Sequence, residues 1–333
     1  MKAAVLGTGA WGTALAQVLA DNGHTVYMWG IEPSQVSDIR DRHTNTAYFE
    51  DLELPRNITA TEDIKEAVED AALMVVAVPT FAVRETVRKA APYINRGVLP
   101  ISVAKGFDPQ TGGFVSDAIR ESLSGYMARE VVTLAGPSFA VEVVRRLPTA
   151  VVAASPSPES SILCQRAFSC SYFRVYTNDD EVGAELCGAI KNVIALASGC
   201  LEGMGYRTNT RSALITRGLA EMGRFVISQG GQYSTVYGLT GLGDLVLTCS
   251  SSESRNYQLG KKIGEAGRAE QVLKENKTTA EGVKACELLI QRARKAKVEM
   301  PICESIYKVL YEGADLKSVM EDLMSRPLRS EED

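Results

Sequence analysis

The sequence of 333 residues predicts an α/β protein: an N-terminal Rossmann-type, doubly wound sheet followed by an all-α C-terminal domain. Two observations support this fold class. In the first half, short apolar runs alternate with helical patterns, as in a parallel sheet wrapped by helices. From about Asp180, helical periodicity dominates and strand patterns nearly vanish. We expect the sheet domain at residues 1–182 and the helical domain at residues 183–333.

The expected elements follow in chain order. Seven apolar runs predict strands at residues 2–7, 25–30, 72–79, 98–105, 131–136, 149–155 and 173–178. Three later segments carry a helical repeat, at residues 180–205, 212–231 and 280–297.

Composition excludes several classes of protein. A formal net charge of −5 argues against a nucleic-acid partner. Seven cysteines occur singly without metal-ligand spacing, so we expect reduced, mostly buried thiols and no metal. The first apolar run stops at Gly7, which is too early for a signal peptide, and no apolar run approaches the ~18 residues of a membrane span. We expect a cytoplasmic protein without a membrane span.

A GxGxxG motif made by Gly7, Gly9 and Gly12 follows the first expected strand and opens a helix. The first glycine permits the tight turn, the second lets the backbone approach a pyrophosphate, and the third lets helix and strand pack closely. A second expected strand, ending at Gly30, completes the context that a dinucleotide site needs. The alternative is a tight turn without a ligand.

Glu32 lies 20 residues after Gly12, where an acidic residue often binds a ribose hydroxyl. Because a carboxylate repels a 2′-phosphate, this position favours NAD over NADP. A surface glutamate beyond a strand is the alternative.

Lys191 interrupts a helix, Leu186–Gly199, that is apolar nearly all round and is therefore expected to be buried. A buried ammonium is costly unless a neighbouring group needs its charge or its proton. Alternatively, the side chain reaches water along its own stem. The residues alone leave both readings open.

Two loops follow expected strands at the sheet edge where ligands bind in such folds. Lys105 ends one strand, and Gly136, Pro137 and Ser138 follow the next. Ser138 either caps a helix or stands beside N–H groups that hold an anion. Lys105 is either a ligand contact or a solvated loop charge.

A final polar segment begins with glycines within residues 238–243. Asp244 follows in an apolar context, and a buried carboxylate generally needs a cationic partner. Arg255 beside Asn256 suits a phosphate group, because a planar guanidinium pairs well with phosphate oxygens. An exposed loop with a surface ion pair is the alternative.

Together these residues resemble the NAD(P)-dependent glycerol-3-phosphate dehydrogenase family, the bacterial biosynthetic type in particular. The matching pieces span essentially the whole chain, in the order GTGAWGTALA, AKG, GPSFAVE, GAIKNVIA, LITRGLAEM, GLGDLVLTC and SRN. The ordered set is specific to the family, although each piece alone is common.

The resemblance implies roles for individual residues. The catalytic positions are Lys191 for proton transfer, with Lys105, Asp244 and Thr248 around it. The substrate-contacting positions are Lys105, Gly136, Ser138, Lys191, Asp244, Ser254, Arg255 and Asn256. The positions that contact NAD or NADP are Gly7, Gly9, Ala10, Trp11, Gly12, Glu32, Lys105, Ala140, Arg255, Thr279 and Glu281. No metal is implied.

Two departures from the family pattern bear on the cofactor. Ala10 stands where the family commonly has serine, which removes a hydrogen bond to the dinucleotide. Members that use NADP often place a basic residue after the second strand, whereas this chain has Ile31 and Glu32.

The resemblance implies reversible reduction of dihydroxyacetone phosphate to sn-glycerol 3-phosphate, which supplies the glycerophospholipid backbone, by a homodimer. Two alternatives remain open: a related two-domain dehydrogenase for a β-hydroxy acid or ketopantoate, and a non-catalytic dinucleotide sensor. A sensor does not need the polar residues between Asp244 and Asn256.

Overall fold

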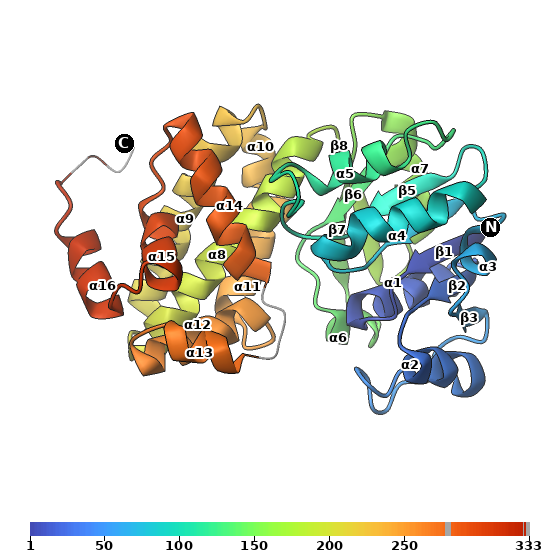
Figure 1. Ribbon diagram of the computed structural model, residues 1–333, viewed down its shortest axis with the longest axis horizontal. Coiled ribbons are helices and arrows are strands. Elements are labelled where there is room, and N and C mark those ends of the chain that lie inside the picture. The colour runs from blue at the N-terminus through green and yellow to red at the C-terminus, as the bar shows by residue number, and fades with distance from the viewer. Residues whose placement is uncertain (277–280, 329, 331–333) are drawn as a thin grey trace. The chain divides into compact units, whose positions relative to one another are not determined.

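The computed structural model describes residues 1–276, 281–328 and 330, and it divides into two compact units. The first, the sheet unit, contains residues 1–185 and 238–240. The second, the helical unit, contains residues 186–237 and 241–333. Each is described by itself below, with the labels of Figure 1.

The sheet unit is built on one twisted sheet with the strand order β3-β2-β1-β4-β5-β6-β7-β8. All neighbouring strands run parallel except β6 and β7, which are antiparallel. The strands are β1 (Lys2–Leu6), β2 (Thr25–Trp29), β3 (Ile58–Thr61), β4 (Leu73–Val76), β5 (Leu99–Ser102), β6 (Val132–Ala135), β7 (Thr149–Ala154) and β8 (Phe173–Asn178). The first six positions follow the Rossmann order, so the predicted fold class is confirmed.

The edge strand β3 was missed by the sequence analysis. Its sequence ITAT has one large apolar residue, Ile58, and it pairs on one side only, with β2. Such a short, half-polar edge strand gives little of the apolar signal on which strand prediction depends. The seven predicted strands are all present, with ends shortened by up to three residues.

Helices cover both faces of the sheet, because successive strand residues point to opposite sides. Ala3 and Val5 of β1 face one apolar cluster, and Ala4 and Leu6 face the other. The helices of this unit are α1 (Ala10–Asp21), α2 (Pro33–Ser37), α3 (Ile64–Val68), α4 (Val83–Ala90), α5 (Val115–Ser122), α6 (Ala140–Val143) and α7 (Pro158–Phe168).

The helical unit contains no strand among its described residues, as predicted. Its helices are α8 (Glu181–Gly203), which begins in the sheet unit, α9 (Thr208–Ser228), α10 (Tyr233–Val236), α11 (Asp244–Ser250), α12 (Arg255–Ala266), α13 (Glu270–Glu275), α14 (Glu281–Ala296), α15 (Pro301–Tyr311) and α16 (Leu316–Met324).

Short 3-10 or π turns occur in addition to these helices. In chain order they lie at Asp38–Arg42, Thr80–Ala82, Ala91–Tyr93 and Leu239–Gly243.

Helix α8 is the only helix of the described residues that is long and apolar enough to cross a membrane by composition. Its apolar residues are interrupted by Glu185 and Lys191, so it contains no continuous apolar run of ~18 residues. Of the qualifying window, 94% is buried inside the protein. A core helix meets the same length and hydropathy criteria, and the burial identifies α8 as one.

Helices α8 and α12 approach each other through glycines spaced four residues apart on each helix. A Cβ at Gly260 would lie 2.1 Å from the Leu196 carbonyl oxygen, and one at Gly264 would lie 2.3 Å from that of Cys200. The pairs follow the same order along both helices, which therefore run parallel. Glycine is required at these positions because backbone atoms occupy the space of a side chain.

Candidate functional site

The turn after β1 has the geometry that a dinucleotide phosphate requires. Gly7 has φ +127°, and a Cβ there would lie 2.6 Å from the Ala77 carbonyl oxygen. A Cβ at Gly12 would lie 2.3 Å from the carbonyl oxygen of Gly7, so this glycine permits close packing of α1 on β1. At Gly9, in contrast, no atom lies within 4 Å of a built Cβ. Gly7 and Gly12 thus have the turn and the close-packing constraints that the motif predicts, and the space beside Gly9 at the N-terminus of α1 is open.

Replacing Gly9 with alanine should leave the fold intact, since φ is −69° and the space is open, but should weaken NADH binding by about 10- to 100-fold. That range corresponds to loss of one charge-assisted hydrogen bond of ~1.5–3 kcal/mol. Nucleotide fluorescence titration measures the Kd. Gly12→Ala is the matched comparison: overpacking against Gly7 should lower thermal stability by ~1–3 kcal/mol. Equal NADH affinity in Gly9→Ala and wild type would contradict the assignment.

The other predicted cofactor residues come from both units. Glu32 is exposed and directly precedes α2. Ala10, Trp11 and Ala140 are half-buried and pack against an apolar core cluster of the sheet. Thr279 lies outside the described residues, and Glu281 is the first residue of α14 in the helical unit.

Lys105, Gly136 and Ser138 gather at the carboxyl end of the sheet. Lys105 Nζ and Ser138 Oγ both donate hydrogen bonds to the Gly136 carbonyl oxygen, at 3.4 and 3.1 Å. Gly136 has φ +143°, and its Cβ would lie 3.0 Å from the Val151 Cα, so glycine is needed there. Ser138 does not cap a helix: the N-cap residue of α6 is Phe139, and it has no side-chain hydrogen bond. The capping interpretation of Ser138 is therefore wrong.

In the helical unit, Lys191 is buried and paired. Its side chain is 5% exposed, and Nζ donates to Asp244 Oδ1 at 2.6 Å and to Thr248 Oγ1 at 2.8 Å. The alternative in which Lys191 reaches solvent along its own stem is therefore wrong. Asp244 has the cationic partner that its apolar context predicted.

Asp244 and Thr248 are fixed by their positions one turn apart on α11. Asp244 is the first residue of the helix, where the dipole favours a carboxylate. Thr248 Oγ1 donates to the Asp244 carbonyl oxygen at 2.6 Å, which turns its lone pairs toward Lys191. The ammonium is thus held by a charge and a hydroxyl that both come from one short helix.

The predicted phosphate residues stand at the N-terminus of α12. Ser254 is its N-cap, and its hydroxyl accepts from the Tyr257 N–H at 3.3 Å. Arg255 is the first helical residue and is exposed, whereas Asn256 is buried. An exposed guanidinium beside a helix N-terminus combines a full charge with the helix dipole, and both attract an anion.

One residue that sequence reasoning did not single out, Gly282, joins the Lys191 helix to this predicted phosphate region. Gly282, in the first turn of α14, donates its N–H to Asn256 Oδ1 at 3.0 Å. A Cβ at Gly282 would lie 2.8 Å from the carbonyl oxygen of Asn192, the residue after Lys191. Gly282 therefore fills the narrow space between α8 and α12. No local pattern marks it, because its constraint comes from two distant helices.

Among the described residues, thiols and metal-ligating side chains add no further site. Six of the seven cysteines are buried, as predicted, and Cys170 is half-buried. Burial raises the pKa of the Cys249 thiol to about 12, which makes it a poor nucleophile. Among the described residues, no group of three His, Cys, Asp or Glu side chains is placed to hold a metal ion.

Comparisons with known proteins place this arrangement in a family. The model described as "NAD-dependent glycerol-3-phosphate dehydrogenase N-terminus" matches residues 2–161, and its C-terminal counterpart matches residues 180–321. A Bacillus velezensis protein named glycerol-3-phosphate dehydrogenase, NAD(P)+, is 42% identical over 98% of this chain and 94% of its own length. A Geobacter protein of the same name is 42% identical over 99% of this chain and 98% of its own length.

A solved structure is similar over the whole chain. The crystal structure of a glycerol-3-phosphate dehydrogenase from Coxiella burnetii has a TM-score of 0.91 at 35% identity. The match covers 98% of this chain and 99% of that one. Sequence and fold thus agree from the glycine-rich turn through most of the helical unit.

Proposed function

This chain belongs to the NAD-dependent glycerol-3-phosphate dehydrogenase family, and we propose that Lys191 and Arg255 carry its reaction: reduction of dihydroxyacetone phosphate to sn-glycerol 3-phosphate with NAD(P)H. The observation that carries these roles is the buried ion pair of Lys191 with Asp244. Asp244 lies on α11, and the next helix in the chain, α12, has an N-terminus that attracts anions. We assign nucleotide binding to residues 1–182, and substrate binding and catalysis to residues 183–333.

Proton transfer is the role of Lys191. A bound reduced nicotinamide would supply the hydride for the substrate carbonyl carbon, and Lys191 would then face the negative charge that develops on the carbonyl oxygen. The Lys191 ammonium stabilises this charge and donates a proton to the oxygen. Asp244 favours the charged form of the lysine, and Thr248 helps to fix the direction of Nζ. In the oxidative direction the neutral amine accepts the proton from the hydroxyl.

Substrate orientation is the role of α12. Arg255 and Asn256 hold the phosphate together with the N-terminal N–H groups of α12. The Ser254 hydroxyl and the Asn256 amide oxygen also fix that helix end, by accepting from Tyr257 and Gly282. Fixing the phosphate fixes the carbonyl carbon two bonds further along the substrate, which is a positioning contribution to the rate. At the sheet edge, Lys105 adds positive charge.

We propose that NADH is preferred over NADPH. Glu32 is exposed directly after β2, and residues 31–39 contain no lysine or arginine to pair with a 2′-phosphate. The test measures kcat/KM for NADH and NADPH with dihydroxyacetone phosphate, first in wild type and then in Glu32→Ala. Removing the carboxylate should raise the relative kcat/KM for NADPH by about 5- to 10-fold, as expected for loss of ~1 kcal/mol of repulsion. An unchanged ratio would remove Glu32 from the nucleotide site.

The same assay decides between the proposed function and its alternatives. Turnover with ketopantoate or a β-keto acid but not with dihydroxyacetone phosphate would indicate the related dehydrogenase class. Nucleotide binding without turnover of any of these compounds would indicate a sensor. Either outcome would reject the proposed substrate.

We further propose a cytoplasmic homodimer. In the helical unit, the rings of Tyr233 and Tyr237 stack on each other and are 52% and 63% exposed. Exposed aromatic clusters are typical of protein contact surfaces. Sedimentation velocity of wild type and Tyr237→Glu tests this: a monomeric wild type would reject the dimer.

A further inference from the structure

Within the sheet unit, the glycine-rich turn after β1 is bound by a buried side chain from a loop further along the chain. Asn45 is 1% exposed. Its Nδ2 donates to the Thr8 carbonyl oxygen at 2.9 Å and to Thr13 Oγ1 at 2.8 Å. Thr8 lies inside the glycine motif, and Thr13 directly follows it. The proposed function gives Asn45 no role, although it contacts both ends of the motif.

The side chain of Thr8 is already fixed without Asn45. Its hydroxyl donates to Gln35 Oε1 at 2.9 Å. It also lies against the end of β2, since a Cβ at Gly30 would lie 2.6 Å from Thr8 Oγ1. The freedom that Asn45 removes is therefore that of the Thr8 carbonyl group, which belongs to the peptide plane shared with Gly9.

The direction of this peptide plane decides what the turn offers to a ligand. The peptide bond is trans, so the Thr8 carbonyl and the Gly9 N–H point in opposite directions. Because Asn45 holds the carbonyl toward the protein interior, the Gly9 N–H points away from Asn45. The space beside Gly9 is open. An N–H group there attracts a phosphate oxygen, whereas a carbonyl oxygen repels one.

Gly9 by itself does not hold the peptide plane in this direction. Its φ is −69° in the structure, but glycine adopts positive φ about as readily. The plane could therefore turn over at little local cost, which would exchange the N–H for a carbonyl on the open side. Turning over requires that the bond from Asn45 to the Thr8 carbonyl breaks. The Thr13 hydroxyl adds a longer bond to the same carbonyl, at 3.5 Å.

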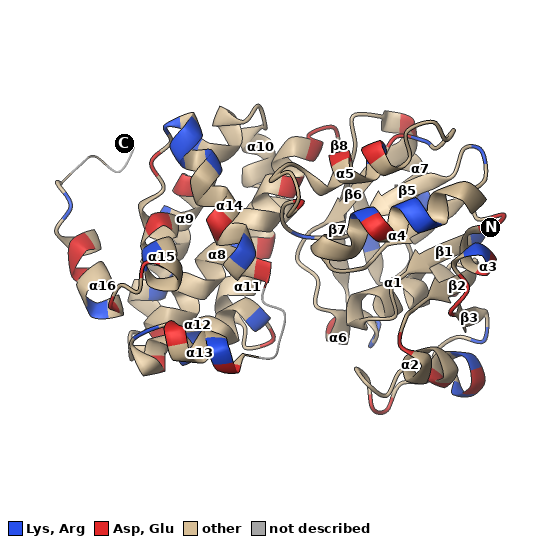
Figure 2. Cartoon of the chain, viewed as in Figure 1, with Lys and Arg blue, Asp and Glu red and all other residues tan. Residues whose placement is uncertain are grey.

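The loop that carries Asn45 is itself held by a buried carboxylate, Asp38, which is 3% exposed. The Thr44 hydroxyl donates to Asp38 Oδ1 at 2.7 Å, and the Thr46 N–H and hydroxyl donate to Oδ2 at 2.8 and 2.9 Å. Figure 2 shows the turn of residues 38–42 as closely spaced blue and red segments beside α2. Asp38 thus binds both chain neighbours of Asn45, so the amide stands on a fixed backbone.

We propose that Asn45 is a positioning residue for the dinucleotide: it holds the peptide plane between Thr8 and Gly9 with the N–H on the open side, and Asp38 acts through it by fixing its loop. The proposal rests on the proposed function, because it presumes that a dinucleotide binds at this turn. It differs from a purely stabilising role, because the loss of affinity must be confined to nucleotides that carry a pyrophosphate.

The experiment measures binding to wild type and Asn45→Ala in the absence of substrate. NADH is titrated by its fluorescence, and ADP-ribose and adenosine are titrated in competition with NADH. Both competitors contain the adenosine group, but only ADP-ribose contains the pyrophosphate. In Asn45→Ala the Kd values of NADH and ADP-ribose should rise about 10-fold, as expected for loss of one hydrogen bond. The Kd of adenosine should change less than about 2-fold.

Asn57→Ala is the matched control. Asn57 also donates from Nδ2 to two backbone carbonyl oxygens, those of Ala20 at 2.9 Å and His24 at 2.8 Å. Ala20 lies near the end of α1 opposite the glycine-rich turn. Asn57→Ala should lower Tm by a few degrees, as Asn45→Ala should. It should leave the Kd values of all three ligands as in wild type.

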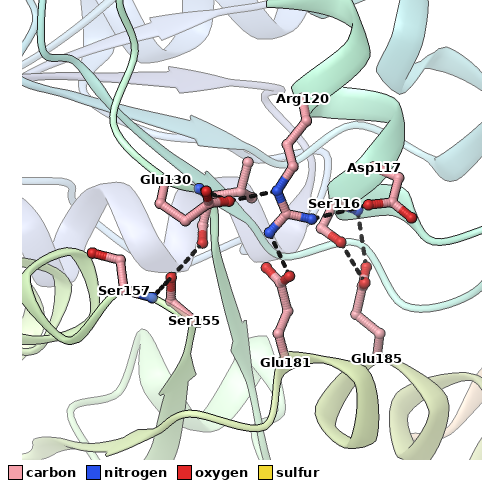
Figure 3. Close-up of polar contacts among 9 residues, drawn as sticks. Ser116, Asp117, Arg120, Glu130, Ser155, Ser157, Glu181 and Glu185 are labelled. Carbon is pink, nitrogen blue, oxygen red and sulfur yellow. Dashed lines mark hydrogen bonds and ion pairs between the residues drawn. The ribbon is translucent and has the colours of Figure 1, made fainter. Parts of the chain in front are cut away.

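A second pair of variants removes a single hydroxyl. Thr13→Val keeps the shape of the side chain but removes one acceptor of Asn45, and it should raise the Kd of NADH about 3-fold. Ser116→Ala is its control in the same unit. The Ser116 hydroxyl donates to Glu185 Oε2 at 2.6 Å, between α5 and the start of α8 (Figure 3). Its removal should leave the Kd of NADH unchanged.

The action of Asp38 through Asn45 is tested by a double-mutant cycle. Asp38→Ala should raise the Kd of NADH about 3- to 10-fold, although the proposed function gives Asp38 no ligand contact. If it acts through Asn45, the double variant with Asn45→Ala should bind NADH no more weakly than Asn45→Ala alone. Fully additive losses would reject this part of the proposal.

The possible outcomes separate the two proposals. If wild type binds neither NADH nor ADP-ribose, the proposed nucleotide site fails. If wild type binds both and folded Asn45→Ala keeps their affinities, the positioning proposal alone is rejected. Equal losses for adenosine and ADP-ribose would also reject it. If Asn45→Ala does not fold, Thr13→Val decides: unchanged NADH binding rejects the proposal, and weaker binding of ADP-ribose but not of adenosine supports it.

Discussion

Replacing Lys191 with alanine should lower kcat for dihydroxyacetone phosphate reduction by about 10²–10⁴-fold, the range for loss of one acid–base group. The reason is structural as well as chemical. Nζ stands 2.6 Å from Asp244 Oδ1 and 2.8 Å from Thr248 Oγ1, and the lysine side chain is buried. NADH oxidation, followed by absorbance with saturating substrate, measures the effect.

Two controls separate loss of the proton donor from loss of the fold. Lys191→Ala leaves Asp244 buried without its ammonium, which can cost ~3–5 kcal/mol of stability. The double variant Lys191→Met with Asp244→Asn removes both charges and should fold better, yet stay inactive. Lys261→Ala removes a lysine that is also paired, with Glu202 at 2.8 Å, but 45% exposed, and should leave kcat unchanged.

Added methylamine gives a positive test of the same role. A small amine that enters the space left in Lys191→Ala should restore part of the activity, with a dependence on amine pKa that reports proton transfer in the rate-limiting step. Near-normal turnover by a folded Lys191→Ala protein would mean that another group moves the proton, and the mechanism proposed above would be wrong.

Replacing Arg255 with alanine should act on KM instead. We expect KM for dihydroxyacetone phosphate to rise by about 10- to 100-fold, because a charge-assisted hydrogen bond to phosphate contributes ~1.5–3 kcal/mol. With dihydroxyacetone, which lacks the phosphate, the change in kcat/KM should be less than about 3-fold. Steady-state kinetics with both substrates measures the difference.

Arg268→Ala is the matched control for charge alone. Arg268 is exposed and follows the C-terminus of α12, whereas Arg255 begins the same helix. Arg268→Ala changes the net charge by the same amount as Arg255→Ala. We expect it to leave kcat/KM unchanged for both substrates. If Arg255→Ala lowered kcat/KM equally for dihydroxyacetone phosphate and dihydroxyacetone, the phosphate would bind elsewhere.

The sequence predicts best those features whose cause is local. The roles of Gly7 and Gly12 follow from a turn and a helix start that are adjacent in the chain, and the structure has both constraints as expected. The burial of Lys191 follows from the apolar residues of its own helix. The apolar context of Asp244 predicted a cationic partner without identifying it, and the structure shows that this partner is Lys191.

The sequence predicts poorly what distant elements impose. Ser116 and Glu185 are 69 residues apart, and each looks like an ordinary surface residue until α5 and α8 meet. Ser138 looked like a cap, but its hydroxyl bonds backward to Gly136 and the helix starts later. The spacing of Gly260 and Gly264 was a usable sign of close helix contact, whereas Gly282 gave no comparable sign.

The glycine contacts between α8 and α12 have a consequence for how the chain tolerates change. Any side chain at Gly199, Gly203, Gly260 or Gly264 would meet backbone atoms at 2.0 to 2.3 Å, so the two helices would have to separate. Separation would carry Arg255 away from Lys191, although none of the four glycines is among the proposed contact residues. The test is to mutate every position in cells whose growth depends on the activity of this protein. These four positions should then tolerate substitution as poorly as catalytic positions do, and even alanine should prevent growth.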